Sequence, residues 1–327
     1  MHRVFTPPSA PPPGLEPQSQ AVYQRLIDIG RIGGTPLHQF PAPQARALAE
    51  EFNRPWNEDP PAMHTVEERS LPGPAGNIRV RLYFPNATRP APTLIFLHGG
   101  GWVICSLDTH DRLCRRLAEE GGFAVASVDY RMGPEHRFPA ATDDCLAAVI
   151  WLARNGGDWG LDTSRLALGG DSAGANLTLA TALALRDAGD SPLRFLALIY
   201  GAFDLAYEGE SFDRFGGEEY MLSMEFLVWF RNNYLNSLAE IADWRASPLR
   251  ARMEGLPPAY VSAAGCDPLR DDAFRLRDKL TAAGVPVTFS DVPGVLHGFM
   301  IWTRELEAAN RECAKIAAAF NETWAGA

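Results

Sequence analysis

The segment Gly170–Gly174, with the sequence Gly-Asp-Ser-Ala-Gly, constrains the fold of this chain more than any other stretch. Upstream, Leu166–Leu168 has the composition of a short buried strand, and downstream Ala173–Leu185 is rich in Ala and Leu and predicts a buried helix. A serine between two glycines on such a strand-to-helix turn is the nucleophile-elbow pattern. The glycines are needed because the backbone is strained and the neighbouring chain leaves no room for a Cβ. Such a pattern arises by chance in roughly one chain of this length in ten, so further residues must support it.

Buried strands and amphipathic helices alternate through the middle of the chain. The buried strands are predicted at Thr93–Leu97, Ala124–Val128, Leu166–Leu168, Phe195–Tyr200, Ala259–Ala263 and Val287–Val292. Continuous apolar strands that alternate with helices indicate an α/β fold, with a parallel sheet covered on both faces. Before them, His64–Arg69 and Ile78–Tyr83 alternate apolar with polar side chains, which predicts an antiparallel pair at the sheet edge.

Two parts of the chain do not follow this alternation. Residues 1–20 are rich in proline and predict a poorly ordered arm, followed by short helices at Ala21–Ile29 and Pro43–Phe52. Tyr207–Asp243 contains an aromatic-rich helix at Met224–Tyr234 and predicts an insertion over the sheet. The predicted division of the chain is an N-terminal arm with cap helices (1–55), a first part of the α/β core (56–204), a cap insertion (205–246) and a second part of the core (247–327).

Composition argues against several classes of protein. The net charge is −10 and no Lys/Arg run is present, which argues against a nucleic-acid partner. The five cysteines include no Cys-x-x-Cys pair, which indicates a reducing compartment and no disulfide framework. The first 20 residues lack the apolar core of a secretory signal, and the longest uncharged stretch, Pro90–Leu107, contains two prolines and three consecutive glycines. We therefore predict a cytoplasmic protein with no membrane span.

Ser172, Asp267 and His297 each follow a predicted strand, in the order serine, aspartate, histidine. Because chemistry gathers at the carboxyl ends of parallel strands, we expect these side chains to meet. A serine hydroxyl needs an adjacent base, so His297 would take the proton and return it to the leaving group, while Asp267 orients the imidazole. Asp204 also follows a buried strand and is an alternative acid. Asp267 could alternatively be part of an ordinary helix N-terminus, where acidic residues are common.

A second motif, His98–Trp102 with the sequence His-Gly-Gly-Gly-Trp, directly follows the predicted strand Thr93–Leu97. A tetrahedral intermediate carries an oxyanion that preorganised donors stabilise, and consecutive glycines let backbone N–H groups point into the site. The N–H groups expected to form this oxyanion hole are those of Gly100, Gly101 and Ala173. We expect His98 to brace the loop, and Asp171 to anchor the elbow through hydrogen bonds to the backbone.

The remaining histidines and cysteines predict neither a metal nor a cofactor. Cys105, His110 and Cys114 lie close in sequence but lack a fourth ligand at zinc spacing. The glycine-rich segment Gly169–Gly174 lacks the lysine of a phosphate-binding loop.

Taken together, five motifs resemble those of the hormone-sensitive-lipase-like carboxylesterases, a bacterial branch of the α/β-hydrolase fold. These motifs are His98–Trp102, Asp129–Ala141, Gly170–Gly174, Asp267–Leu269 and His297–Phe299. The resemblance covers about residues 64–320. It implies an eight-stranded, mostly parallel sheet with helices on both faces and a helical cap. It also implies hydrolysis of short- to medium-chain acyl esters through an acyl-enzyme, without a cofactor, and relatives of this kind often form a homodimer through the last edge strand.

The chain departs from the family pattern at two places: Cys105 stands where the family often has glycine, and Met132-Gly133 replaces Leu-Ala. Both departures are expected to affect which substrate the protein accepts. Two other functions stay open: an amide, carbamate or lactone hydrolase using the same residues, and a non-catalytic receptor similar to the plant hormone receptors, which lack the histidine present here as His297. Four aromatic residues either line an apolar substrate pocket or only pack in the core: Trp102, Phe226, Trp229 and Phe230.

Overall fold

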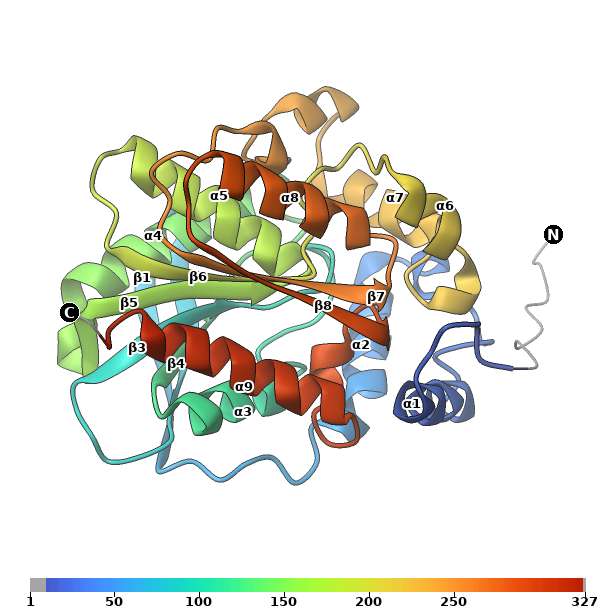
Figure 1. Cartoon of the computed structure of the whole chain (residues 1–327), viewed down its shortest axis with the longest axis horizontal. Helices are drawn as coiled ribbons and strands as arrows, with labels where there is room; N and C mark the ends of the chain where they lie inside the picture. The colour runs from blue at the N-terminus through green and yellow to red at the C-terminus, as the bar shows by residue number, and fades with distance from the viewer. Residues whose placement is uncertain (1–9, 326–327) are drawn as a thin grey trace.

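An eight-stranded sheet lies at the centre of the computed structural model, which describes residues 10–325 (Figure 1). Its strands are β1 (Thr65–Gly73), β2 (Gly76–Phe84), β3 (Ala91–Leu97), β4 (Ala124–Asp129), β5 (Leu161–Asp171), β6 (Leu193–Ile199), β7 (Ala259–Cys266) and β8 (Val287–Leu296). Their order across the sheet is β1-β2-β4-β3-β5-β6-β7-β8. Strand β2 runs antiparallel to both of its neighbours, and the other pairs are parallel. The predicted mostly parallel sheet with an antiparallel edge is confirmed.

Helices cover both faces of the sheet, with α4, α5 and α8 on one face and α3 and α9 on the other (Figure 1). The α-helices are α1 (Pro17–Asp28), α2 (Ala42–Asn53), α3 (Asp111–Gly121), α4 (Ala140–Asn155), α5 (Ala173–Asp187), α6 (Glu210–Phe215), α7 (Met224–Tyr234), α8 (Arg270–Ala282) and α9 (Glu307–Glu322). Short 3-10 turns are η1 (Leu37–Gln39), η2 (Arg54–Trp56), η3 (Gly156–Trp159), η4 (Glu218–Tyr220), η5 (Leu238–Ala242), η6 (Pro248–Arg250) and η7 (Phe299–Trp302).

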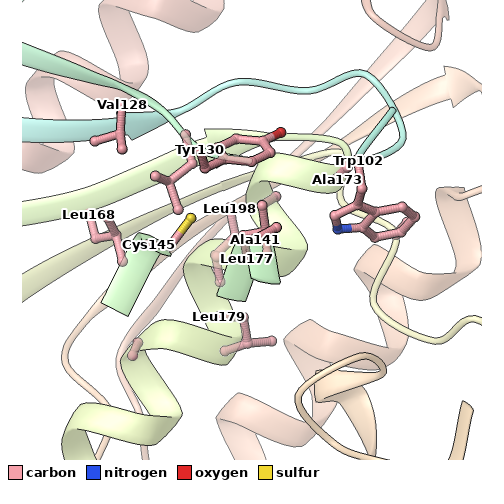
Figure 2. Packing of buried hydrophobic residues seen from close by; sticks show 14 of the residues in the cluster. Trp102, Val128, Tyr130, Ala141, Cys145, Leu168, Ala173, Leu177, Leu179 and Leu198 are labelled. Carbon is pink, nitrogen blue, oxygen red and sulfur yellow. The ribbon is translucent and has the colours of Figure 1, made fainter. Parts of the chain in front are cut away.

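The apolar strands explain why the sheet has a hydrophobic core on each side. Side chains alternate between faces along a strand, so in β3 Ile95 and Leu97 pack into one core while Leu94 and Phe96 pack into the other. Figure 2 shows part of the first core, where Cys145 of α4 and neighbouring leucines gather beneath the sheet. Burying one such leucine contributes about 1.5–3 kcal/mol relative to leaving it exposed.

Strand β5 is longer than the predicted Leu166–Leu168, because it begins at Leu161 and continues to Asp171. The sequence predicts a strand that ends at Gly169, and glycine weakens a strand that has no partner. Here β5 lies between β3 and β6, and both neighbours pair with Gly169 and with the glycine that follows it. Pairing with β3 and β6 therefore extends β5 up to the turn at Ser172.

The prediction of a poorly ordered arm over residues 1–20 is wrong for its C-terminal end, which belongs to helix α1. Residues 1–9 of the predicted arm lie outside the described part of the chain. Helix α1 begins at Pro17, a position where proline is favoured because its missing N–H is not needed. Ser19 on this helix is fully buried, and the N–H of Glu16 donates to Gly294 O at 2.9 Å. The segment from residue 16 onward is thus fixed against β8.

The predicted helical cap is formed by α1, α2, α6 and α7, which gather beyond the carboxyl ends of the strands (Figure 1). This arrangement places the cap over the edge of the sheet where the elbow lies. The exact division between core and cap stays a prediction. Within residues 10–325, no helix is both long enough and apolar enough to cross a membrane.

Candidate active site

Ser172 lies at the sharp turn between β5 and α5. Its backbone has φ 55° and ψ −119°, a strained conformation for a residue with a Cβ. The N–H of Ser172 donates to Ile199 O at 2.9 Å, which holds the turn against β6. A Cβ on Gly174 would overlap the carbonyl oxygen of Leu97, so only glycine allows α5 to start this close to β3. These constraints fix the serine side chain at the sheet edge.

The structure brings Ser172, His297 and Asp267 into one hydrogen-bonded chain. His297 Nε2 lies 2.8 Å from Ser172 Oγ, and His297 Nδ1 lies 2.7 Å from Asp267 Oδ2. Asp267 is fully buried, and its other oxygen accepts from the N–H of Leu269 at 2.8 Å. The ring of Tyr200 meets the imidazole edge-on, with centroids 5.0 Å apart. The imidazole is therefore held from both sides, in a position to take the serine proton.

Asp204, the alternative acid, lies in a different environment. Its carboxylate accepts from the Arg250 guanidinium at 3.0 and 3.1 Å, and from the N–H of Ala206 at 3.1 Å. It has no contact with His297. The geometry therefore favours Asp267 as the partner of the histidine.

Three backbone N–H groups expected to form an oxyanion hole line the same pocket as Ser172: those of Gly100, Gly101 and Ala173. No residue within 10–325 accepts a hydrogen bond from any of them. Gly101 has φ 59°, and a Cβ there would overlap the Phe230 ring, so both conformation and space require glycine. Unpartnered N–H groups beside a serine are suited to stabilising an oxyanion.

Asp171 holds the glycine loop as well as the elbow. Its Oδ1 accepts from the N–H of Gly99 at 2.8 Å and lies 3.1 Å from His110 Nε2, while Oδ2 accepts from the Tyr200 hydroxyl at 3.3 Å. Burial raises the pKa of the Asp171 carboxyl, but His110, the Gly99 N–H and His98 together lower it below its usual value. An ionised carboxylate therefore lies between the loop and the elbow.

His98 braces the loop, as expected, without contacting Ser172. Its Nδ1 donates to Gly99 O at 2.7 Å, its ring stacks on Tyr130 at 4.5 Å, and its own carbonyl accepts from the Tyr130 hydroxyl at 2.6 Å. Burial, followed by the repulsion of His110, lowers the pKa of His98 to about 4. The imidazole is therefore neutral at neutral pH and acts as a fixed support.

A pocket of about 950 Å³, counted to its open mouth, lies between the cap and the sheet edge. Trp102, Phe226 and Phe230 line it, as the sequence suggested. Trp229 is not among the described residues that form the wall, and it packs against Phe230 with ring centroids 5.4 Å apart, which agrees with the packing alternative for this residue. Adjacent helical residues point about 100° apart, so α7 presents Phe230 to the pocket and turns Trp229 away.

Several wall residues were missed by sequence reasoning. Arg31, Asn53 and Trp56 come from the N-terminal segment, and Tyr207 and Leu222 come from the insertion. The amphipathic helix α1 was the available signal that this segment packs on the core, but nothing in the sequence placed it beside Ser172. Cys105, expected to shape the pocket, does line it.

Metal ligands do not gather anywhere in the described chain: residues 10–325 contain no group of three His, Cys, Asp or Glu side chains arranged to hold an ion. Cys105 and Cys114 are buried, and burial raises the pKa of the Cys105 thiol to about 12. Burial also raises the pKa of the Cys114 thiol, so both thiols are neutral at neutral pH.

A family model described as the α/β-hydrolase fold matches residues 94–301, a stretch that contains the elbow, the glycine loop and the histidine. The chain belongs to the α/β-hydrolase family. Within it, the predicted resemblance to the hormone-sensitive-lipase-like carboxylesterases is confirmed by the relatives of this hydrolase.

The hydrolase is similar to several curated esterases. It is 37% identical to the ethyl acetate hydrolase of Pseudomonas putida over 299 residues, which cover 89% of this chain and 93% of that protein. It is 35% identical to carboxylesterase NlhH of Mycobacterium tuberculosis over 312 residues, 93% of this chain and 95% of that protein. The carboxylic ester hydrolase LipN of the same species is 39% identical over 249 residues, 73% of this chain and 66% of LipN.

Solved structures give the same result. The ester hydrolase EH1AB1 from the metagenome of Lake Arreo superposes with a TM-score of 0.89 at 39% identity, over 94% of this chain and 98% of that one. The hyperthermophilic esterase of the archaeon Pyrobaculum calidifontis gives a TM-score of 0.88 at 35% identity, with the same coverage. The predicted fold and enzyme class, a carboxylic ester hydrolase, are confirmed.

Proposed function

We propose that this hydrolase is a serine carboxylesterase that cleaves short- to medium-chain acyl esters through an acyl-enzyme. The observation that carries the proposal is the hydrogen-bonded chain from Ser172 Oγ through His297 to Asp267, at the base of a pocket lined by free N–H groups. Each group in this chain matches a role that ester hydrolysis requires.

Acylation begins when His297 Nε2 accepts the Ser172 proton and Oγ attacks the ester carbonyl carbon. The carbonyl oxygen becomes an oxyanion, which the N–H groups of Gly100, Gly101 and Ala173 stabilise. Asp267 accepts from His297 Nδ1 and stabilises the imidazolium. The C–O bond to the alcohol then breaks, and the departing oxygen takes the proton from Nε2. In deacylation, water repeats these steps and releases the carboxylic acid.

The pocket supports a preference for short- to medium-chain acyl groups. Its wall is mainly apolar, as is usual for sites that bind small organic molecules. Phe226 and Phe230 stack at 4.2 Å and close one side of it. A long fatty chain would have to leave through the mouth and lose these contacts.

The two alternative functions considered from the sequence are supported to different degrees. Amide, carbamate and lactone bonds could be cleaved by the same groups, and the esterase names of the relatives favour an ester. The receptor is disfavoured because His297 is present and lies 2.8 Å from Ser172.

A homodimer stays a prediction, for which β8 offers an edge at the end of the sheet. Light scattering would test it. The cytoplasmic location also stays a prediction, supported by five unpaired cysteines.

A screen of nitrophenyl esters from acetyl to palmitoyl tests the proposal, with nitroanilides of the same acyl groups in parallel. We expect a maximum between acetyl and octanoyl, little activity on palmitoyl and little on anilides. Ser172→Ala should lower kcat by roughly 10⁴-fold or more, because the serine and histidine act as a unit. Ser70→Ala is the matched control, since Ser70 is exposed on β1. Anilides cleaved faster than esters would reassign the bond.

A further inference from the structure

Arg31 places a positive charge in the wall of the pocket that also contains Ser172. It follows helix α1, where its backbone N–H donates to Leu26 O at 2.9 Å. Its guanidinium makes no hydrogen bond and no ion pair with any residue from 10 to 325. Arg46 and Arg131, by contrast, each bind a carboxylate, at 2.5 Å to Glu135 and 2.7 Å to Asp144. Arg31 is thus a cation with unused donors.

The surroundings of this guanidinium are apolar. It lies over the Phe226 ring, 5.7 Å from the centroid, and Leu26 and Trp56 belong to the same wall. Burial lowers the pKa of Arg31 to about 10, so the side chain is still charged at neutral pH. A charge that has lost part of its hydration gains strongly from an anionic partner.

No carboxylate among residues 10–325 forms a direct ion pair with Arg31. Glu218 is the acid that acts on Arg31, but its Oε1 accepts from Ser223 Oγ at 2.9 Å and lies 3.9 Å from His38 Nε2. Cys105 also lies nearby, and its raised pKa keeps it a neutral thiol. Glu218 therefore acts on Arg31 only at a distance, and the guanidinium donors remain available to an anion in the pocket.

We propose that Arg31 binds a carboxylate on the substrate, so that this enzyme prefers esters that carry one carboxylate group in addition to the ester bond. The inference rests on the proposed function, because it places the ester carbon at Ser172. A planar guanidinium can bind a carboxylate through two parallel hydrogen bonds, which orients the substrate as well as holding it. The Phe226 ring beneath the guanidinium would keep that fork in place.

Matched pairs of substrates test the proposal, with hydrolysis followed by titration of released acid. One series places the carboxylate on the acyl side: monoethyl succinate, glutarate and adipate against ethyl butyrate, pentanoate and hexanoate. A second places it on the alcohol side: O-acetyl-3-hydroxybutyrate against sec-butyl acetate. The readout is the ratio of kcat/KM for the charged ester to that for its neutral partner, measured for the wild type, Arg31→Gln, Arg31→Lys and Arg194→Gln. Arg194 is an exposed arginine on β6 and controls for net charge.

We expect the wild type to prefer the charged ester in at least one series, and Arg31→Gln to lower that ratio roughly 10- to 100-fold, mainly through KM. Arg31→Lys should restore part of it, and Arg194→Gln should leave it unchanged. The series that responds identifies the side of the ester that Arg31 binds. Ratios within twofold of the wild type in Arg31→Gln overturn the inference while the proposed function stands.

Two further outcomes separate the hypotheses. If the wild type cleaves neither charged nor neutral esters, the proposed function fails and this inference fails with it. If Arg31→Gln does not fold, inhibition of wild-type nitrophenyl butyrate hydrolysis decides. Competitive inhibition by glutarate that is at least tenfold stronger than inhibition by neutral glutaramide, and that weakens in 1 M NaCl, supports the inference. Equal inhibition by both compounds overturns it.

Discussion

The carboxylate of Asp171 accepts a 2.8 Å hydrogen bond from the N–H of Gly99, which joins the elbow to the glycine loop across 72 positions of the chain. The same carboxylate contacts His110 and Tyr200, and Tyr200 packs against His297. One buried side chain therefore positions the oxyanion donors relative to both the serine and the histidine.

Replacing Asp171 by Asn should lower kcat more than it affects KM. The amide keeps the shape but loses the charge that holds His110 and the Gly99 N–H, so the donors shift from the oxyanion position. Misplaced donors of this kind cost roughly 10²-fold in rate, and we expect a 10- to 100-fold loss. Steady-state kinetics on nitrophenyl butyrate give the result. Asp158→Asn, at an exposed aspartate, is the control. A change confined to KM would argue against this positioning role.

The two candidate acids can be separated by one pair of variants. Asp267→Asn should lower kcat by roughly 10⁴-fold, because the amide stabilises the wrong imidazole tautomer. Asp204→Asn should change kcat less than about threefold, since Asp204 binds Arg250 and not His297. Comparison of kcat at pH 8 checks both. The opposite ranking of the two variants would reassign the acid.

His98 predicts a specific loss of stability in acid. Its folded-state pKa of about 4 lies below the usual value of 6.5, so the unfolded chain takes up the proton first as the pH falls. The stability that the neutral imidazole contributes is complete above about pH 6.5 and is lost progressively towards pH 4. Asn in its place can still donate to Gly99 O, but it does not titrate.

Urea unfolding of the wild type and His98→Asn at pH 7 and 4.5 measures this effect. The free energy of unfolding of the wild type should fall more than that of the variant, by about 2–3 kcal/mol. Acid-sensitive groups that do not interact with His98 are common to both proteins and cancel in the comparison. Equal losses in the two proteins would mean that His98 has the same pKa in the folded and unfolded states.

Helix α7 gives a prediction about chain length. Phe230→Leu should widen the pocket and move the preferred nitrophenyl ester to a longer acyl chain, since each additional buried methylene contributes about 0.8 kcal/mol, or about fourfold in kcat/KM. Trp229→Leu should leave the chain-length profile in place, because Trp229 packs behind the wall. Profiles that shift equally in both variants would contradict this assignment of the two faces.

The comparison of Phe230 with Trp229 also illustrates where sequence reasoning reaches its limit. A helix that is aromatic on several faces has no clear periodicity, so the sequence could not indicate which side faces the pocket. Ser172, Asp267 and His297 were predictable because each follows a predicted strand, and parallel strands bring their carboxyl ends together. Arg31 gave no such signal, since its position beside Ser172 depends on how α1 packs over the sheet.

Strand and helix ends show the same distinction. The run Leu166–Leu168 correctly located β5, but its extension through Gly169 and Gly170 comes from pairing with β3 and β6. At the C-terminus, apolar residues recur at helical spacing from Trp302 to Phe320, yet α9 begins at Glu307 and Trp302 ends a separate 3-10 turn. Local pattern locates these elements, and long-range packing sets their ends.

Covalent labelling tests the central claim most directly. The hydrolase is treated with a nitrophenyl alkylphosphonate, which an activated serine attacks with loss of nitrophenolate, and the adduct is located by peptide mass spectrometry. We predict a single adduct, on Ser172, that forms in step with the loss of esterase activity and is absent from Ser172→Ala and much slower in His297→Ala. Complete inactivation with Ser172 unmodified, or an adduct on another residue that accounts for the lost activity, would contradict the account.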